Sequence, residues 1–233
     1  MSTTVSITTT EALRQPVVPA IPSTPAQHGR YDRILATAAG LLALGGEDML
    51  QMKELAQRAG VSLATLYRYF PAKEYVLLAI AVSRYTSALR RVADEVPDGA
   101  TAQERVTNHL LREFRAGQRD QKLSASLGRV LTDTRADYRP IIAQVRELHV
   151  QILQQVAVAG RPLSREEYRR LMIVHDVFGA ANQRWLAGVC SAAEARFEIR
   201  LGGHLLNVPG LFAEHEQVAP VLARTPSRAS RSR

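Results

Sequence analysis

The chain has 233 residues, 46% of them hydrophobic, and its 30 Lys and Arg side chains against 22 Asp and Glu give a formal net charge of +8. The single cysteine, Cys190, excludes an internal disulfide framework and favours a reducing compartment such as the cytoplasm. No apolar run approaches the roughly 18 residues that would cross a membrane, and residues 1–29 lack the basic segment of a signal peptide.

The positive charge has two readings. An excess of basic side chains is typical of proteins that bind nucleic acid. However, only Lys53, Lys73 and Lys122 are lysines, and a GC-rich genome produces arginine enrichment through codon usage. The charge is also spread along the chain, so both readings stay open and the function has to come from sequence pattern.

Both ends of the chain are predicted to be disordered arms. Residues 1–26 are rich in Thr, Ser and Pro, with Pro16, Pro19, Pro22 and Pro25 spaced every third residue. Residues 213–233 end in TPSRASRSR, a basic tail that either frays at the surface or touches DNA phosphate.

Between the arms, the apolar residues recur with a helical period and no segment alternates as a half-buried strand does. We therefore expect an all-α chain of about nine helices. The first carries an apolar face from Ile34 to Leu42 and stops at Gly45–Gly46. The others are expected at Met52–Ala59, Leu63–Tyr69, 72–96, Ala102–Arg119, Lys122–Asp133, Tyr138–Ala159, Ser164–Cys190 and Ala192–Asn207.

The second and third of these helices form a predicted helix-turn-helix. Gly60 can adopt the left-handed conformation that ends one helix, and Ser62 is a favourable N-cap for the next. Pro71 then stops the short third helix. Two short helices joined by such a turn are typical of DNA-binding modules, although the bare pattern also occurs in other all-α proteins.

The side chains of the third helix fit a DNA groove. Its buried face is expected to hold Leu66 and Phe70. Its outer face offers small, hydroxyl, aromatic and guanidinium groups, which suit the major groove and the phosphate backbone, and Lys73 stands where a phosphate could meet the start of the fourth helix. For the two tyrosines, packing against the first and fourth helices is an equally good reading. The outer and flanking residues are Ala64, Thr65, Tyr67, Arg68 and Tyr69.

The run from Gln51 to Lys73, QMKELAQRAGVSLATLYRYFPAK, closely resembles the DNA-binding signature of TetR-family transcriptional regulators. Two positions depart from the usual family pattern, because Gln51 replaces a common Thr and Ala64 a common Gly. The resemblance implies a DNA-binding domain at residues 27–87, with the helix-turn-helix at 51–70. It also implies an effector-binding and dimerisation domain at residues 88–212.

The same resemblance implies a homodimer on a near-palindromic operator, with an apolar effector held in the C-terminal domain. It assigns DNA contacts to Gln51, Ser62, Ala64, Thr65, Tyr67, Arg68, Tyr69 and Lys73. The last two helices would form the dimer seam, although their small residues, such as Gly179 and Ala180, would equally serve packing within one subunit. The regulator would be a repressor released from DNA by its effector.

The layout also resembles the KstR-type repressors of sterol catabolism in actinobacteria. The shared features are a Gln-Met opening of the second helix, the run TLYRYFPxK and the pair Trp185–Leu186. This resemblance implies an effector of steroid or acyl-CoA type.

Candidate effector contacts lie on the expected helices of the second domain, where apolar residues at helical spacing serve equally as plain core. They are Phe114, Leu127, Leu131, Tyr138, Met172, Phe178, Asn182 and Trp185, with His175 as a further polar candidate. The histidines show no i, i+4 pairing, so no metal or other cofactor is expected. An enzyme or a helical protein-binding adaptor remains an alternative, but no phosphate-binding loop or nucleophile motif favours an enzyme.

Overall fold

A computed structural model describes residues 21–95 and 98–208, and these ranges contain α-helices, short 3-10 helices and no strand, so the all-α prediction is confirmed. None of the helices in these ranges is long and apolar enough to span a membrane. The α-helices are α1 (Pro25–Gly45), α2 (Met52–Arg58), α3 (Leu63–Tyr69), α4 (Lys73–Asp94), α5 (Ala102–Arg119), α6 (Gln121–Leu131), α7 (Arg139–Val158), α8 (Arg165–Leu186) and α9 (Ala192–Gly203).

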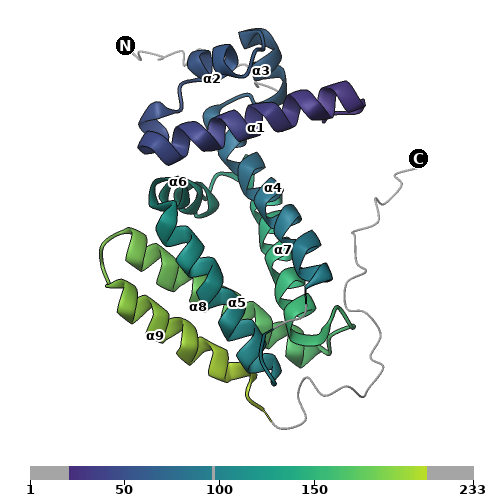
Figure 1. Cartoon of the computed structure of the whole chain (residues 1–233), viewed down its shortest axis with the longest axis vertical. Coiled ribbons are helices and arrows are strands. Elements are labelled where there is room, and N and C mark those ends of the chain that lie inside the picture. Colours follow the sequence, from purple (N-terminus) through teal and green to yellow (C-terminus); the bar gives the residue numbers. More distant parts are fainter. Residues whose placement is uncertain (1–20, 96–97, 209–233) are drawn as a thin grey trace, which may run out of the picture.

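Helices α1, α2 and α3 form a small head at one end of the molecule (Figure 1). Its core contains Leu41, Leu55 and Leu66, all buried. The turn between α2 and α3 matches the sequence prediction, since Gly60 has a φ of 64° and the Ser62 side chain accepts a hydrogen bond of 3.1 Å from the Thr65 amide. This turn fixes the direction in which α3 leaves the head.

The start of α1 differs slightly from the expectation of an arm up to residue 26. Pro25 is the first helical residue and the Thr24 side chain caps the helix by accepting from the Gln27 amide at 3.3 Å. Proline is favourable at this position because the first helical N–H has no intrahelical partner. The remaining expected arms, within residues 1–20 and 209–233, lie outside the described residues.

Helix α4 joins the head to the body of the molecule. Its first half contributes Val76, Leu77 and Ile80 to the core of the head, whereas Val92 near its end belongs to the core of the body. The domain boundary expected at residue 87 therefore falls within one continuous helix. A movement of α4 relative to the body would necessarily move the head.

Helices α5, α7, α8 and α9 share the core of the body, which includes Phe114, Leu153, Leu171 and Ile199. Helix α6 is different, because Leu123 and Val130 belong to the same buried cluster as the head. In Figure 1, α6 lies directly between the head and the body.

The end of α9 approaches two neighbouring helices closely at Gly202 and Gly203. A Cβ atom on Gly203 would lie 2.1 Å from Thr107 Oγ1 on α5, and one on Gly202 would lie 2.8 Å from Val177 Cγ1 on α8. No side chain larger than hydrogen fits at Gly203 without displacement, since real contacts are not that short. The absence of a side chain at Gly202 and Gly203 therefore allows α9 to pack closely against α8 and α5.

We predict that Gly203→Ala lowers the free energy of unfolding by about 1–3 kcal/mol, because α9 must move away from α5. Gly40→Ala is the matched control: a Cβ on this helical residue meets nothing within 4 Å, so a gain of about 0.5–1 kcal/mol is expected. Urea unfolding followed by circular dichroism measures both. Equal stability of the Gly203 variant and the wild type would contradict the close approach of α9.

Candidate nucleic-acid interface and internal cavity

Helix α3 presents a mixed surface to the outside of the head. Tyr67 is 44% exposed, and Ser62, Ala64 and Arg68 are also exposed, while Thr65 is half-buried. The Ser62 hydroxyl also donates to Thr65 Oγ1 at 2.9 Å, which orients both hydroxyl groups at the start of the helix. Donors of this kind, on a short protruding helix, can reach phosphate oxygens and base edges.

The structure corrects the prediction of a DNA contact for Tyr69. Its side chain is 2% exposed and its ring packs edge-on against Tyr31 of α1, with the centroids 5.8 Å apart. The Arg68 guanidinium lies over the same ring at 5.6 Å. Tyr69 therefore serves the core of the head and supports Arg68, which is the packing alternative that the sequence left open. Tyr67, two residues earlier, points to the opposite side because two steps along a helix turn by about 200°.

Gln51 and Lys73 flank the helix-turn-helix. Gln51 is exposed at the N-cap of α2, where its side-chain amide donates to the Asp48 carbonyl at 3.3 Å. Lys73 is the first residue of α4, and its Nζ lies 3.6 Å from a Glu47 carboxylate oxygen. The N-cap of α4 is Ala72, which gives no side-chain acceptor to the first N–H groups. An anion can therefore meet both these groups and the ammonium of Lys73.

One exposed residue of this surface was not expected from the sequence. Leu63, the first residue of α3, is 41% exposed although it is large and apolar. Such a side chain could contact the methyl group of a thymine. Its position directly after the N-cap Ser62 could have been used to predict this exposure from the sequence.

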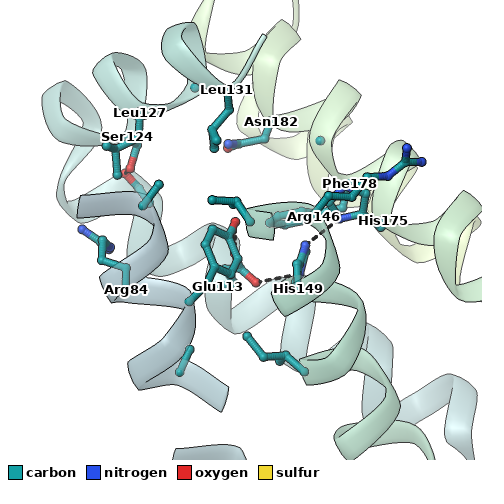
Figure 2. A pocket seen from close by; sticks show the side chains of 18 of the residues that line it. Arg84, Glu113, Ser124, Leu127, Leu131, Arg146, His149, His175, Phe178 and Asn182 are labelled. Atoms are coloured by element: carbon teal, nitrogen blue, oxygen red, sulfur yellow. Dashed lines mark hydrogen bonds and ion pairs between the residues drawn. The ribbon is translucent and has the colours of Figure 1, made fainter. Parts of the chain in front are cut away.

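The body contains a cavity of about 930 Å³ that is partly open to the outside and is lined by residues of α4 to α8. Four of the candidate effector contacts lie in its wall, and Figure 2 shows their side chains around the hollow. They are Leu127, Leu131, Phe178 and Asn182, joined by His175. The apolar members give the cavity a surface suited to a hydrophobic molecule.

The other four candidates do not line this cavity. Phe114 and Trp185 pack against each other in the core, with ring centroids 5.0 Å apart, and Tyr138 packs edge-on against Tyr75 at 5.2 Å. Met172 lies on α8 but away from the wall. Helical spacing could not separate these residues from the lining, because core and cavity residues share the same inward faces.

A chain of polar side chains crosses the cavity wall. The Tyr85 hydroxyl of α4 donates to Glu113 Oε1 of α5 at 3.2 Å, and His149 Nε2 of α7 lies 3.2 Å from Glu113 Oε2. His149 Nδ1 is in turn 2.7 Å from His175 Nδ1 of α8 (Figure 2). These four side chains therefore connect α4, α5, α7 and α8 inside the cavity.

The neighbouring groups decide whether Glu113 and His175 are charged. Burial by itself would raise the pKa of Glu113, but the charge and hydrogen bond of His149, the charge of His109 and the hydrogen bond from Tyr85 outweigh it and hold the pKa at about 2. Burial, His149 and Arg146 lower the pKa of His175 to about 3. At neutral pH, Glu113 is thus an anion and His175 is uncharged.

The cluster of Tyr85, Glu113, His149 and His175 was not predicted from the sequence, because its members lie far apart in the polypeptide and on different helices. The signal that could have been used is the placement of each polar residue on an otherwise inward helical face. Among the described residues, no group of three or more His, Cys, Asp or Glu side chains is placed to hold a metal ion.

Arginine side chains surround the exposed edge of the cavity. Arg146 is held by Asp176, with Nη2 at 2.9 Å from both carboxylate oxygens, and Arg112 Nη1 lies 3.4 Å from Asp98. Arg84 and Arg91 extend from α4 along the same wall. These groups make the rim of the cavity basic, in contrast to the apolar part of its interior at Leu127, Leu131 and Phe178.

Known proteins share this architecture. The family model described as "Bacterial regulatory proteins, tetR family" matches residues 34–80. The HTH-type transcriptional repressor KstR of Mycobacterium tuberculosis is 27% identical over 181 residues, which cover 78% of this chain and 82% of that protein. The crystal structure of a TetR transcriptional regulator from Rhodococcus sp. RHA1 superposes with a TM-score of 0.71 at 27% identity, covering 79% of this chain and 98% of the other.

A more distant fold neighbour is the Bacillus subtilis regulator FadR, solved in complex with stearoyl-CoA. Its TM-score is 0.58 at 18% identity, and the match covers 76% of this chain and 98% of that one. The head, with its helix-turn-helix, and the helical body are thus those of one group of proteins. The head therefore carries the DNA-binding domain of the TetR family of bacterial transcriptional regulators, and the chain is similar to a repressor and a regulator of that family over most of its length.

Proposed function

We propose that the protein is a repressor that binds a near-palindromic operator as a homodimer and is released by an apolar effector bound in the cavity. The relationship to KstR supports repression. We expect the protein to act in the bacterial cytoplasm, where operator DNA is found.

The observation that carries this proposal is the double role of α6. Leu127 and Leu131 of this helix line the cavity. From the same helix, Lys122 Nζ donates to the Leu44 carbonyl of α1 at 2.8 Å, and Arg129 Nε donates to Glu47 Oε1 at 2.6 Å. An effector that displaces α6 would therefore also displace the head.

Displacement of the head matters because DNA sets a fixed spacing. In a dimer the two α3 helices must enter successive major grooves, about 34–36 Å apart. An effector that favours another separation weakens DNA binding, and by thermodynamic linkage the operator weakens effector binding by the same factor.

The homodimer is supported by an exposed apolar face on α9. Phe197 and Leu201, four residues apart on α9, are 65% and 58% exposed, and Leu205 in the following 3-10 helix is 38% exposed. Ile173 of α8 is also exposed. Large apolar side chains grouped in this way are typical of an interface between subunits.

The effector class is proposed from the chemistry of the cavity. Its apolar wall suits a steroid or an acyl chain, and the arginines at its rim could meet the phosphates of an acyl-CoA. The effector class is also supported by a fold neighbour, FadR of Bacillus subtilis, which was solved in complex with stearoyl-CoA.

We predict that Tyr67→Ala and Lys73→Ala each weaken operator binding about tenfold or more, because each removes a donor to DNA. Tyr69→Phe is the matched control, since it deletes a buried hydroxyl for which the described residues offer no hydrogen-bond partner. Fluorescence anisotropy with DNA from upstream of the gene, at several salt concentrations, measures the affinities. Unchanged affinity in both alanine variants would rule out the proposed interface.

Phe197→Glu combined with Leu201→Glu is expected to give monomers, because two charges would be buried in the seam. Leu44→Glu tests a residue of α1 that is 67% exposed and lies outside this face, and it should leave the dimer intact. Light scattering after size exclusion gives the mass. A dimer of the double variant would place the interface elsewhere.

Lys122→Ala combined with Arg129→Ala tests the coupling through α6. Neither side chain lines the cavity, so effector affinity without DNA should persist. The factor by which a saturating acyl-CoA or neutral steroid weakens operator binding should fall about fivefold, because two exposed polar contacts to the head are lost. Arg115→Ala serves as control, since Arg115 bonds within α5 to the Leu111 carbonyl. An unchanged factor would show that α6 does not transmit the signal.

A further inference from the structure

Glu113 is a carboxylate that an apolar cavity does not require. It projects from α5 into the hollow (Figure 2), and its side chain keeps 30% of its surface exposed there. Tyr85 approaches one of its oxygens and His149 approaches the other, each at 3.2 Å. The neighbours thus hold the carboxylate in one orientation.

This carboxylate retains hydrogen-bonding capacity. An ionised carboxylate has about four lone-pair positions and can only accept. Tyr85 and His149 account for one position on each oxygen, and His109 Nε2 is farther away, at 3.9 Å from Oε2. The exposed part of the group can therefore accept from a molecule in the cavity.

The fixed negative charge selects among the polar groups that such a molecule could bring. A ligand carboxylate beside Glu113 would place two like charges in a poorly solvated space. An ether or ketone oxygen has no proton to donate. A group with an N–H or O–H is required.

The wider charge of the cavity distinguishes a cation from a neutral donor. Four arginines, Arg84, Arg91, Arg112 and Arg146, line the hollow with three carboxylates, those of Glu95, Glu113 and Asp176, and Arg112 is also paired with Asp98. The imidazoles of His149 and His109 already face Glu113, at 3.2 and 3.9 Å, so an ammonium gains less there than it would from an isolated carboxylate. A hydroxyl satisfies the acceptor without adding charge.

We infer that Glu113 is a specificity-determining residue that accepts a hydrogen bond from an uncharged hydroxyl on an otherwise apolar effector. The apolar part of the molecule lies against Leu127, Leu131 and Phe178. The inference rests on the proposed function, because it assumes that this cavity is the effector site. It names the polar group by which the effector is recognised.

Binding of matched small probes to the DNA-free protein tests the inference. Dodecanol, dodecyl methyl ether, dodecanoate and dodecylammonium share one chain and differ at the head group. Isothermal titration calorimetry below the aggregation concentration of each probe should show the alcohol binding about tenfold tighter than the ether, because a bond to a charged acceptor is lost with the proton. The alcohol should also bind more tightly than the ammonium.

Glu113→Gln is the diagnostic variant, since it removes the charge at nearly constant shape. The preference for alcohol over ether should fall several-fold, because a neutral amide oxygen is the weaker acceptor. Glu95→Gln changes another carboxylate of the same wall and should leave the preference unchanged. The probe series on the wild type decides the inference even if the Glu113 variant does not fold.

Several outcomes would overturn the inference. They are equal binding of alcohol and ether to the wild type, tighter binding of the ammonium, no binding of any probe, or an unchanged preference in Glu113→Gln. None of these results concerns operator release, which is measured separately with DNA. A protein that releases DNA with steroids or acyl-CoA but shows no alcohol preference would keep the proposed function and lose this inference.

Discussion

The packing of α6 between the core of the head and the cavity of the body is the constraint on which the rest of the structure depends. Leu123 and Val130 are buried with the head, while Leu127 and Leu131 face the cavity. Because successive residues turn by about 100°, one short helix can present these sets on neighbouring faces. The helix cannot shift at the cavity without changing its fit against the head, since the contact with the head is close-packed.

Helix α8 holds α6 from the opposite direction. The Gln183 side-chain amide donates to the Gly128 carbonyl at 2.8 Å, and both residues line the cavity. A dimer seam on α8 and α9 would keep α8 stationary, so that an effector would move α6 and α4 rather than the seam. The glycines that lock α9 against α5 and α8 would add to this rigidity. The moving and fixed parts of the proposed mechanism thus follow from where the helices pack most closely.

The polar chain in the cavity has a structural cost that indicates a role. Burying a carboxylate is unfavourable unless charged and hydrogen-bonded partners compensate, and Glu113 is supported by Tyr85 and His149 from two other helices. An apolar residue would fill the same space without this requirement. Retaining the anion gives the cavity a means of selecting a polar group, whereas its apolar wall selects only size and hydrophobicity.

The sequence by itself determined the helices, the turn at Gly60 and Ser62, and the exposed character of Arg68, because these depend on periodicity and on local backbone preference. It could not separate Tyr69 from Tyr67, nor Phe114 from Leu127, because which side of a helix meets a neighbour is decided by packing. The cluster formed by Tyr85, Glu113, His149 and His175 could not be predicted for the same reason. Its members approach within hydrogen-bonding distance only when α4, α5, α7 and α8 are assembled, so the tertiary structure alone decided the chemistry of the cavity.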